Sequence, residues 1–493
     1  MTPSNLPIDF HAIAPQIVMA ATLFLVLLVD LFLPAGKKHR TMPIALLGAL
    51  ASLGASLTLI GDQRTTFGGS FVADNFAVLF DVFFSAVAIV VILLSYRYVR
   101  DGRSFQGEYY FLILCSFLGA MSMGASRDLL LLFISLELVS APAFLLVGFR
   151  KKDPRSNEAA LKFFLISVLS TAVMLYGISL IYGVTGTTRL SGIASALASP
   201  GNTAAHSSLA LAAILFTVAG FAFKVSAFPF QFWAPDTYEG APVPIAAYLS
   251  VASKAAGFVG LLQIMFVGFL PKAHFWAPIF ALLSLFTMFL GNLVAIQQRQ
   301  IVRLLSYSSI AQAGYMLLPF ALAGYSASVD HSAFSSVVLY ILIYAIMNLG
   351  AFAVVIGMSR TSPSVQISDF SGLGRRLPAV AVAMTAFMVS LGGIPPTAGF
   401  WGKFSIFLAA ISRGGIGNWL AVAMVLNSVI SLFYYLGIVR AMWLEPSIEP
   451  VRPIRMPALV VAVAMVAMIG VFVVGVFPNV LAHFPPFTVL ASP

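Results

Sequence analysis

Long apolar runs dominate this chain, and short polar segments separate them. A membrane-spanning helix needs about 20 apolar residues, and fourteen runs come close to that length. They cover residues 14–33, 42–61, 74–96, 109–125, 128–149, 158–183, 207–229, 242–268, 276–297, 301–324, 331–359, 377–411, 418–441 and 456–480. Most runs are apolar on every side, which is typical of helices in a membrane bundle. The pattern predicts an all-α polytopic membrane protein, with residues 1–493 as a single membrane domain of about 14 transmembrane helices.

Two of these runs contain helix-breaking residues. The seventh run ends in the segment FAFKVSAFPFQFWAPDTYEGAPVP, where Pro229 follows Lys224 by five residues. The twelfth is too long for one straight crossing, and Gly392, Gly393, Pro395 and Pro396 lie at its middle. Proline removes a backbone donor and interrupts a helix. We therefore expect helices 7 and 12 to be broken inside the membrane.

The positions of the two broken helices predict an internal repeat. They are five spans apart, so they cross the membrane in opposite senses, and discontinuous helices at matching positions of inverted halves mark transport sites. The prediction comprises four segments: N-terminal helices 1–3 (1–108), a first repeat of helices 4–8 (109–270), a second repeat of helices 9–13 (276–443) and a C-terminal helix 14 (456–493).

Composition narrows the class of protein further. Hydrophobic residues make up 60% of the chain and charged residues only 9%, whereas soluble domains carry about 25% charged residues. No room remains for a sizeable soluble domain. The net charge of +10 fits basic cytoplasmic loops better than nucleic-acid binding. The segment MTPSNLPIDFHAIAPQ lacks a basic region and a cleavage site, so no signal or transit peptide is expected.

The basic residues indicate an orientation. Eighteen of the 27 lysines and arginines lie in alternate loops: Lys37, Lys38, Arg40, Arg97, Arg100, Arg103, Arg150, Lys151, Lys152, Arg155, Arg299, Arg303, Arg360, Arg375, Arg376, Arg440, Arg452 and Arg455. The opposite loops hold five: Arg64, Arg127, Arg189, Lys272 and Arg413. Cytoplasmic loops are enriched in lysine and arginine. The bias places the first set in the cytoplasm and both termini on the opposite side of the membrane.

The remaining four basic residues are all lysines inside predicted spans: Lys162, Lys224, Lys254 and Lys403. Ionisable residues in a membrane usually face a wet interior and carry function. A desolvated lysine can release its proton, whereas arginine stays charged. Glu137, near the middle of the fifth span, is the natural partner of Lys224. This set indicates a proton path.

The surroundings of the lysines differ. Lys254 lies near the middle of the eighth span among small residues, and Lys403 follows the break in the twelfth. Lys162 lies only a few residues inside the sixth span beside Glu158, so reaching up to the cytoplasmic surface is an alternative to a role in the path.

Other polar residues give weaker signals. Surface contacts or capping explain Asp30, Asp74 and Asp81 as well as function does. Tyr307, Ser308, Ser309 and Gln312 either hold water or pack. The lone Cys115 rules out an intrachain disulfide, and the six histidines have no metal-ligand spacing. The GLGRR run at Gly372 lacks the strand and third glycine of a nucleotide site. No catalytic redox centre, cofactor or metal site is expected in this chain.

Three motifs resemble a known family. KVSAFPFQFWAPDTYEGAP, LLSYSSIAQAGYMLL and GGIPPTAGFWGKF are similar to segments of the antiporter-like membrane subunits of respiratory complex I and of multisubunit sodium–proton antiporters. The resemblance covers nearly the whole chain. It implies proton translocation by a non-redox subunit, coupled to quinone reduction elsewhere in an NADH–quinone oxidoreductase. The implied partners are other membrane-arm subunits, notably a second antiporter-like subunit, and membrane lipids. Those other subunits would carry NADH, FMN, iron–sulfur clusters and quinone.

The resemblance also implies a proton path through Glu137, Lys224, Lys254 and Lys403, with Lys162 at the position of a sixth-span lysine. One departure concerns the residue after the broken seventh helix, where many members have histidine and this chain has Gln231. Glutamine does not titrate, so water or another group would have to bridge there. Two alternatives remain, namely a cation–proton antiporter subunit without redox partners and a structural membrane scaffold.

Overall fold

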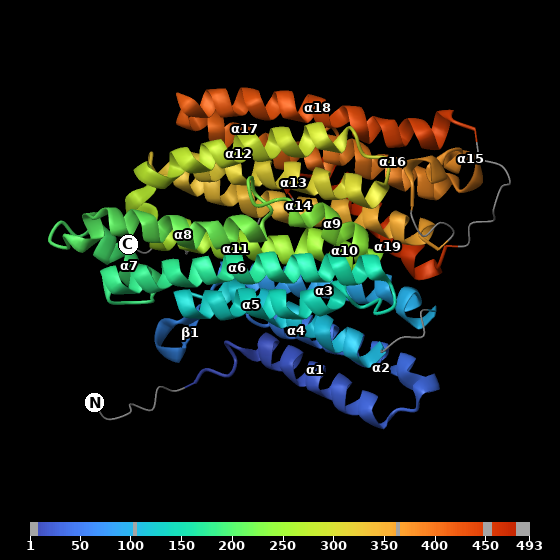
Figure 1. The fold of residues 1–493 in the computed structure, drawn as a ribbon, viewed down its shortest axis with the longest axis horizontal. Coiled ribbons are helices and arrows are strands. Elements are labelled where there is room, and N and C mark those ends of the chain that lie inside the picture. Colours follow the sequence, from blue (N-terminus) through green and yellow to red (C-terminus); the bar gives the residue numbers. More distant parts are fainter. Residues whose placement is uncertain (1–7, 102–105, 361–364, 447–455, 480–493) are drawn as a thin grey trace.

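The computed structural model describes residues 8–101, 106–360, 365–446 and 456–479. Three arginines of the predicted cytoplasmic set, Arg103, Arg452 and Arg455, lie outside these ranges. Long helices lie side by side along one common direction, and the chain adds them across the bundle from α1 to α18 (Figure 1). The described structure is that of an all-α polytopic membrane protein, as the apolar runs predict.

The N-terminal part contains three long helices. They are α1 (Ala14–Phe32), α2 (Thr41–Leu57) and α3 (Asn75–Asp101). Between α2 and α3 the chain forms a short antiparallel hairpin of β1 (Arg64–Thr66) and β2 (Phe71–Ala73), with Arg64 opposite Ala73. This hairpin was not predicted, because three-residue strands are too short to show an alternating pattern.

The next part of the chain carries the first broken helix. Its helices are α4 (Gln106–Ala125), α5 (Leu129–Val147), α6 (Pro154–Thr185), α7 (Leu190–Ala198), α8 (Ser208–Lys224), α9 (Trp233–Gly240), α10 (Val243–Tyr248) and α11 (Lys254–Gln263). The π-helical stretch Leu249–Ser253 joins α10 to α11, and a second one, Ile264–Gly268, continues α11, so that one continuous span results.

The last part carries the second broken helix. Its helices are α12 (Ala273–Ala295), α13 (Ile301–Leu317), α14 (Ala327–Met358), α15 (Leu373–Arg376), α16 (Pro378–Gly392), α17 (Ala398–Arg413), α18 (Ile416–Leu444) and α19 (Ala458–Val476). Helices α12 and α13 approach closely at Gly291, where an added Cβ would lie 2.5 Å from the backbone nitrogen of Ala311. Small residues allow such contacts between membrane helices.

Eleven helical segments of the described residues are long and apolar enough to cross a membrane. The other three predicted spans, 207–229, 301–324 and 377–411, contain shorter helices or two half-helices. The count of fourteen and the inverted repeat therefore stay predictions.

One span lies at the centre of the bundle. The apolar window of Val243–Gly268 is completely buried in protein, whereas that of α19 is only 28% buried. A helix covered on all sides cannot present a side chain to lipid. Any charged residue on this span must therefore find its partners inside the protein.

Proline lies in the first break, and glycine and proline lie in the second. Helix α8 ends at Lys224, and the chain reaches α9 at Trp233 after passing Pro229. Helix α16 ends at Gly392, Gly393 follows in the left-handed region at φ 87°, and α17 begins at Ala398. Each break leaves carbonyl groups without a partner in their own helix, so these groups are free to accept from side chains.

Candidate functional site: a row of buried lysines

Lys224 lies at the first break. It is the last residue of α8, and only 2% of it is exposed. Its ammonium Nζ donates to the Ser140 Oγ on α5 at 2.8 Å. Glu137, one turn earlier on α5, is half-buried and accepts from the Thr171 hydroxyl of α6 at 2.9 Å. Ser140, which binds Lys224, and Glu137 lie one turn apart on α5, so this turn joins the carboxylate to the amine.

Lys254 lies in the completely buried span. It follows the π-helical stretch Leu249–Ser253, and such stretches occur often at functional sites. Its Nζ donates to the Ser309 carbonyl at 2.8 Å and to the Ser309 Oγ at 2.6 Å. Gly257, one turn further, lies against the aliphatic part of Lys224, because an added Cβ would be 3.0 Å from the Lys224 Cγ. The helix that carries Lys254 therefore packs directly on Lys224.

Lys403 lies on α17, and its side chain returns to the second break. Its Nζ donates to the Gly392 carbonyl, at the end of α16, at 3.0 Å. The same nitrogen lies 4.6 Å from the centre of the Tyr315 ring. A cation is favoured both at a helix C-terminus and over an aromatic face. The break in α16 thus provides the contacts that Lys403 makes.

Helix α13 connects Lys254 to Lys403. It supplies Ser309 to one lysine and Tyr315 to the other, and six residues of helix span about 9 Å. Gln312 lies between them and donates to the Tyr435 hydroxyl at 3.1 Å and to the Leu391 carbonyl at 3.2 Å. The Leu391 carbonyl is next to that of Gly392, which Lys403 binds. Polar groups therefore occupy the whole interval between the two lysines.

The other polar residues of α13 that the sequence singled out fall into two groups, one in a polar network and one in the hydrophobic core. Ser308 makes a 2.5 Å hydrogen bond with the Tyr435 hydroxyl, and Tyr340 donates to Gln312. Ser308, Ser309 and Gln312 thus belong to a buried polar network. Tyr307 packs partly buried at the edge of the hydrophobic core.

Sequence reasoning missed a second polar group beside Tyr315. Asn292 on α12 donates to the Asn427 Oδ1 at 3.0 Å, and its own Oδ1 accepts from the Tyr434 hydroxyl at 2.9 Å. Both asparagines are fully buried. The sequence did carry a signal for this group, because two asparagines lie inside apolar runs and a buried amide requires a hydrogen-bond partner.

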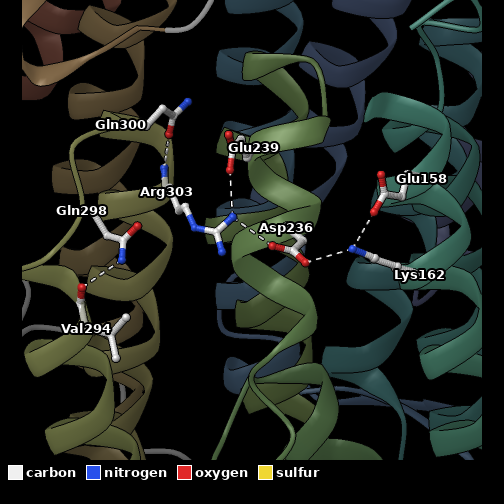
Figure 2. A network of polar contacts seen from close by, with 8 residues as sticks. All are labelled: Glu158, Lys162, Asp236, Glu239, Val294, Gln298, Gln300 and Arg303. Atoms are coloured by element: carbon white, nitrogen blue, oxygen red, sulfur yellow. Dashed lines mark hydrogen bonds and ion pairs between the residues drawn. The ribbon is translucent and has the colours of Figure 1, made fainter. Parts of the chain in front are cut away.

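Lys162 lies apart from the buried row. Its side chain is 47% exposed and pairs with Glu158 at 2.7 Å and with Asp236 on α9 at 3.3 Å. Figure 2 shows that Asp236 also reaches Arg303 on α13, at 2.9 Å, and that Arg303 binds Glu239 at 2.8 Å. Asp236 thus bridges α6 and α13 across the start of α9. The structure places Lys162 in a surface ion-pair network, and sequence reasoning missed the acids of α9.

The residues of the two breaks have different surroundings. Pro229, Pro395 and Pro396 are exposed, whereas Gly392 is buried. Gln231 follows the first break, and its Oε1 has no hydrogen-bond partner among the described residues. A buried amide oxygen of this kind is a place where water binds.

The remaining membrane acids serve local structure. Asp74 caps α3 by accepting from the Ala77 amide and pairs with Arg127 at 2.6 Å. Asp30 pairs with Lys38 at 2.6 Å. Asp81 accepts from the Gln16 amide at 3.0 Å. Asp74 thus caps α3 and pairs with Arg127, whereas Asp30 is a buried partner of Lys38 rather than a surface residue.

The buried row can hold and pass protons. Lysine amines and a carboxylate both titrate, and serine, tyrosine and glutamine groups lie between them. In the described part of the chain, no three His, Cys, Asp or Glu side chains gather as metal ligands would. Proton transfer is the chemistry that this set of groups supports.

The comparison with known families decides the classification. Residues 126–431 match the family described as NADH:quinone oxidoreductase/Mrp antiporter, transmembrane. The chain belongs to this family. The matched range contains Glu137, Lys224, Lys254 and Lys403, so the whole buried row lies inside the family's shared region.

Relatives in this antiporter family match over nearly their full length. The chain is 38% identical to NADH-quinone oxidoreductase subunit N of Trichlorobacter lovleyi, over 97% of this chain and 96% of that one. It is similar to a chain of respiratory complex I from Thermus thermophilus, with TM-score 0.79, 31% identity and coverage of 96% and 99%. A chain of the Mrp complex from Dietzia sp. DQ12-45-1b shares the fold, with TM-score 0.84, 19% identity and 98% coverage of both chains.

Proposed function

We propose that this chain is a proton-translocating membrane-arm subunit of an NADH–quinone oxidoreductase. The observation that carries the proposal is the row Lys224, Lys254 and Lys403, each buried inside the membrane bundle and each bound to a polar group rather than to lipid. The names of the full-length relatives supply the complex in which such a row would work.

Two features of the sequence favour the subunit N type within the family. Residue 403 is lysine, whereas subunit M has glutamate at the similar position. The run SLELVSAPAFLLVGF around Glu137 also looks most like subunit N.

The proposed path starts on the cytoplasmic side and ends on the periplasmic side, with both termini periplasmic. A proton reaches Lys224, and the charge state of Glu137 controls whether Lys224 holds or releases it. The proton passes to Lys254, then along Ser309, water held by Gln312, and Tyr315 on α13 to Lys403, and leaves from there. Lys162 keeps α9 in place instead of carrying protons.

The chain acts without a redox group of its own in this proposal. NADH, FMN, iron–sulfur clusters and quinone belong to partner subunits, and a second antiporter-like subunit is its neighbour in the membrane. The experiment that identifies these partners is purification in mild detergent. NADH-linked subunits should co-purify, and their absence from an intact preparation would contradict the proposal.

The decisive test replaces the buried amine. Lys224→Ala and Glu137→Gln should each lower NADH-driven proton pumping about tenfold or more, since each removes a group that holds the transferred proton. Lys152→Ala is the matched control, because Lys152 is an exposed loop lysine. Full proton pumping by both variants in assembled complexes would contradict the proposal.

The second candidate is a subunit of a cation–proton antiporter. The observation in its favour is the shared fold with the Mrp complex chain. Proton exchange driven by a sodium gradient, in membranes without NADH-linked subunits, would establish it. Under a structural-scaffold role, the same substitutions would alter assembly alone.

A further inference from the structure

A polar cavity opens beside the network of Figure 2, at the end of the bundle that the basic loops assign to the cytoplasm. It has a volume of about 550 Å³. Charged side chains from α6, from α9 and from the loop before α6 line this cavity, among them Arg150, Glu158, Lys162, Asp236 and Glu239. A cavity with such walls holds water and exchanges protons with the solution.

Tyr238 reaches from this cavity into the protein. It lines the cavity on α9, yet none of its surface is exposed to solvent. Helix α9 packs against α13, the helix that carries Ser309, and the Tyr238 hydroxyl has no hydrogen-bond partner among the described residues. A fully buried phenol hydroxyl without a protein partner requires water.

Ser309 is the residue that binds Lys254. Its Oγ and its carbonyl both accept from the Lys254 ammonium. The sequence of groups from the cavity is therefore Tyr238, Ser309 and Lys254. It does not include Lys224, so this route returns a proton to Lys254 after the proton from Lys224 has passed on to Lys403.

The surroundings of Lys254 contain several further buried oxygens without a protein partner. They belong to Ser253, Ser306, Tyr344 and Asn348. Ser253 precedes Lys254 directly, and Ser306 lies one turn before Ser309. Asn348 donates to Ser250, one turn before Lys254. Buried oxygens gathered in this way bind ordered water, which provides the contacts that a proton relay needs.

We propose that Tyr238 and Ser309 form a direct proton uptake route from the cytoplasmic cavity to Lys254. When Lys254 is a neutral amine, the Tyr238 hydroxyl passes its proton through the Ser309 hydroxyl to the lysine nitrogen. Tyr238 then takes a proton from cavity water, so both hydroxyls end neutral and Lys254 becomes an ammonium. The inference rests on the proposed function, because it assumes that Lys254 carries transferred protons.

The test uses the intact complex in inside-out membrane vesicles, whose outer solution is the cytoplasmic side. Tyr238→Phe removes only the hydroxyl, and Ser309→Ala removes the next one. Each should slow NADH-driven pumping about tenfold, since water replaces a positioned proton carrier poorly. Ser309→Thr keeps a hydroxyl and should restore most of the rate. Tyr109→Phe is the matched control, because Tyr109 is equally buried but binds Ser95 on α3.

The pH of the outer solution separates a relay from a packing role. A defect in proton uptake should widen as this pH is raised and shrink as it is lowered, whereas a packing defect should not change. The double variant should be no slower than the slower single variant, because the two hydroxyls act in series.

Two outcomes would overturn the inference and spare the proposed function. One is full pumping by Tyr238→Phe and Ser309→Ala at every pH, in preparations where Lys224→Ala abolishes pumping. The other is a loss that is independent of pH and matches that of Tyr109→Phe. Full pumping by Lys224→Ala and Glu137→Gln would instead remove the proposed function itself.

Discussion

At the scale of single residues, each buried lysine has a specific oxygen to bind. Lys224 has a serine hydroxyl, Lys254 has a serine hydroxyl and a carbonyl, and Lys403 has the last carbonyl of a half-helix. A buried ammonium with one or two neutral acceptors is held less firmly than one in an ion pair. Such a group can therefore change its proton occupancy when a nearby charge changes.

The first residue-scale prediction concerns Ser140. Ser140→Ala removes the hydroxyl that accepts from Lys224 and should slow pumping about tenfold, equivalent to ~1.4 kcal/mol. Ser135→Ala is the control, because Ser135 is a buried serine on the same helix whose hydroxyl has no partner among the described residues. NADH-driven acidification of vesicles measures both. Equal rates for the two variants would show that the Ser140 contact is irrelevant to transfer.

The second residue-scale prediction separates Lys162 from Lys224. Lys162→Arg should pump normally, because Asp236 and Glu158 need only a cation. Lys224→Arg should lose pumping, since arginine does not release a proton. Pumping rates per assembled complex provide the measurement. If Lys162→Arg is as inactive as Lys224→Arg, Lys162 carries protons after all.

At the scale of elements, the broken helices position the lysines. The end of α16 supplies the carbonyl for Lys403, and the end of α8 places Lys224 against α5 and α11. Helix α13 runs between the two breaks with a polar face. If α16 continued without a break, the Gly392 carbonyl would be bonded inside the helix and Lys403 would lose this acceptor.

The element-scale prediction tests the second break. Gly393 has φ 87°, and an added Cβ would lie 2.9 Å from the Lys403 Cδ. Gly393→Ala should destabilise the subunit by about 1–2 kcal/mol, the cost of a left-handed alanine, and should displace Lys403. The control is Gly437→Ala on α18, where an added Cβ meets no atom within 4 Å.

Thermal unfolding of the purified complex and vesicle pumping measure both glycine variants. Gly437→Ala should be neutral or stabilising by up to ~1 kcal/mol, as alanine is favoured in helices. An unchanged transition and full pumping for Gly393→Ala would mean that the break tolerates another backbone conformation.

At the scale of the whole molecule, the bundle forms around the buried span Val243–Gly268. Protein covers this span completely, Lys224 of α8 packs against it at Gly257, and α13 links its Lys254 to Lys403 of α17. The helices around this span keep the row of lysines away from lipid, and a bundle with fewer helices would leave the row exposed to it. The cost of a charge in hydrocarbon explains why the row lies inside.

The whole-molecule prediction concerns orientation. After Cys115→Ser removes the only cysteine, Gln63→Cys should react with an impermeant thiol reagent from the periplasmic side and Lys152→Cys from the cytoplasmic side. Both positions are exposed loop residues. The expectation follows from the basic loops. Reversed labelling would invert the proposed direction of the proton path.

The sequence alone determined the membrane class, the positions of most spans, the two breaks and the residues of the candidate row. These follow from the chain itself, because apolar length, proline and lysine act locally or through the solvent. Only the tertiary structure decided which oxygen each lysine binds, that Lys162 belongs to a surface network, that Asp236 and Asn292 have partners, and that the Tyr238 hydroxyl has none among the described residues. Those contacts join helices far apart in the chain, and hydropathy carries no signal about which polar groups meet inside a bundle.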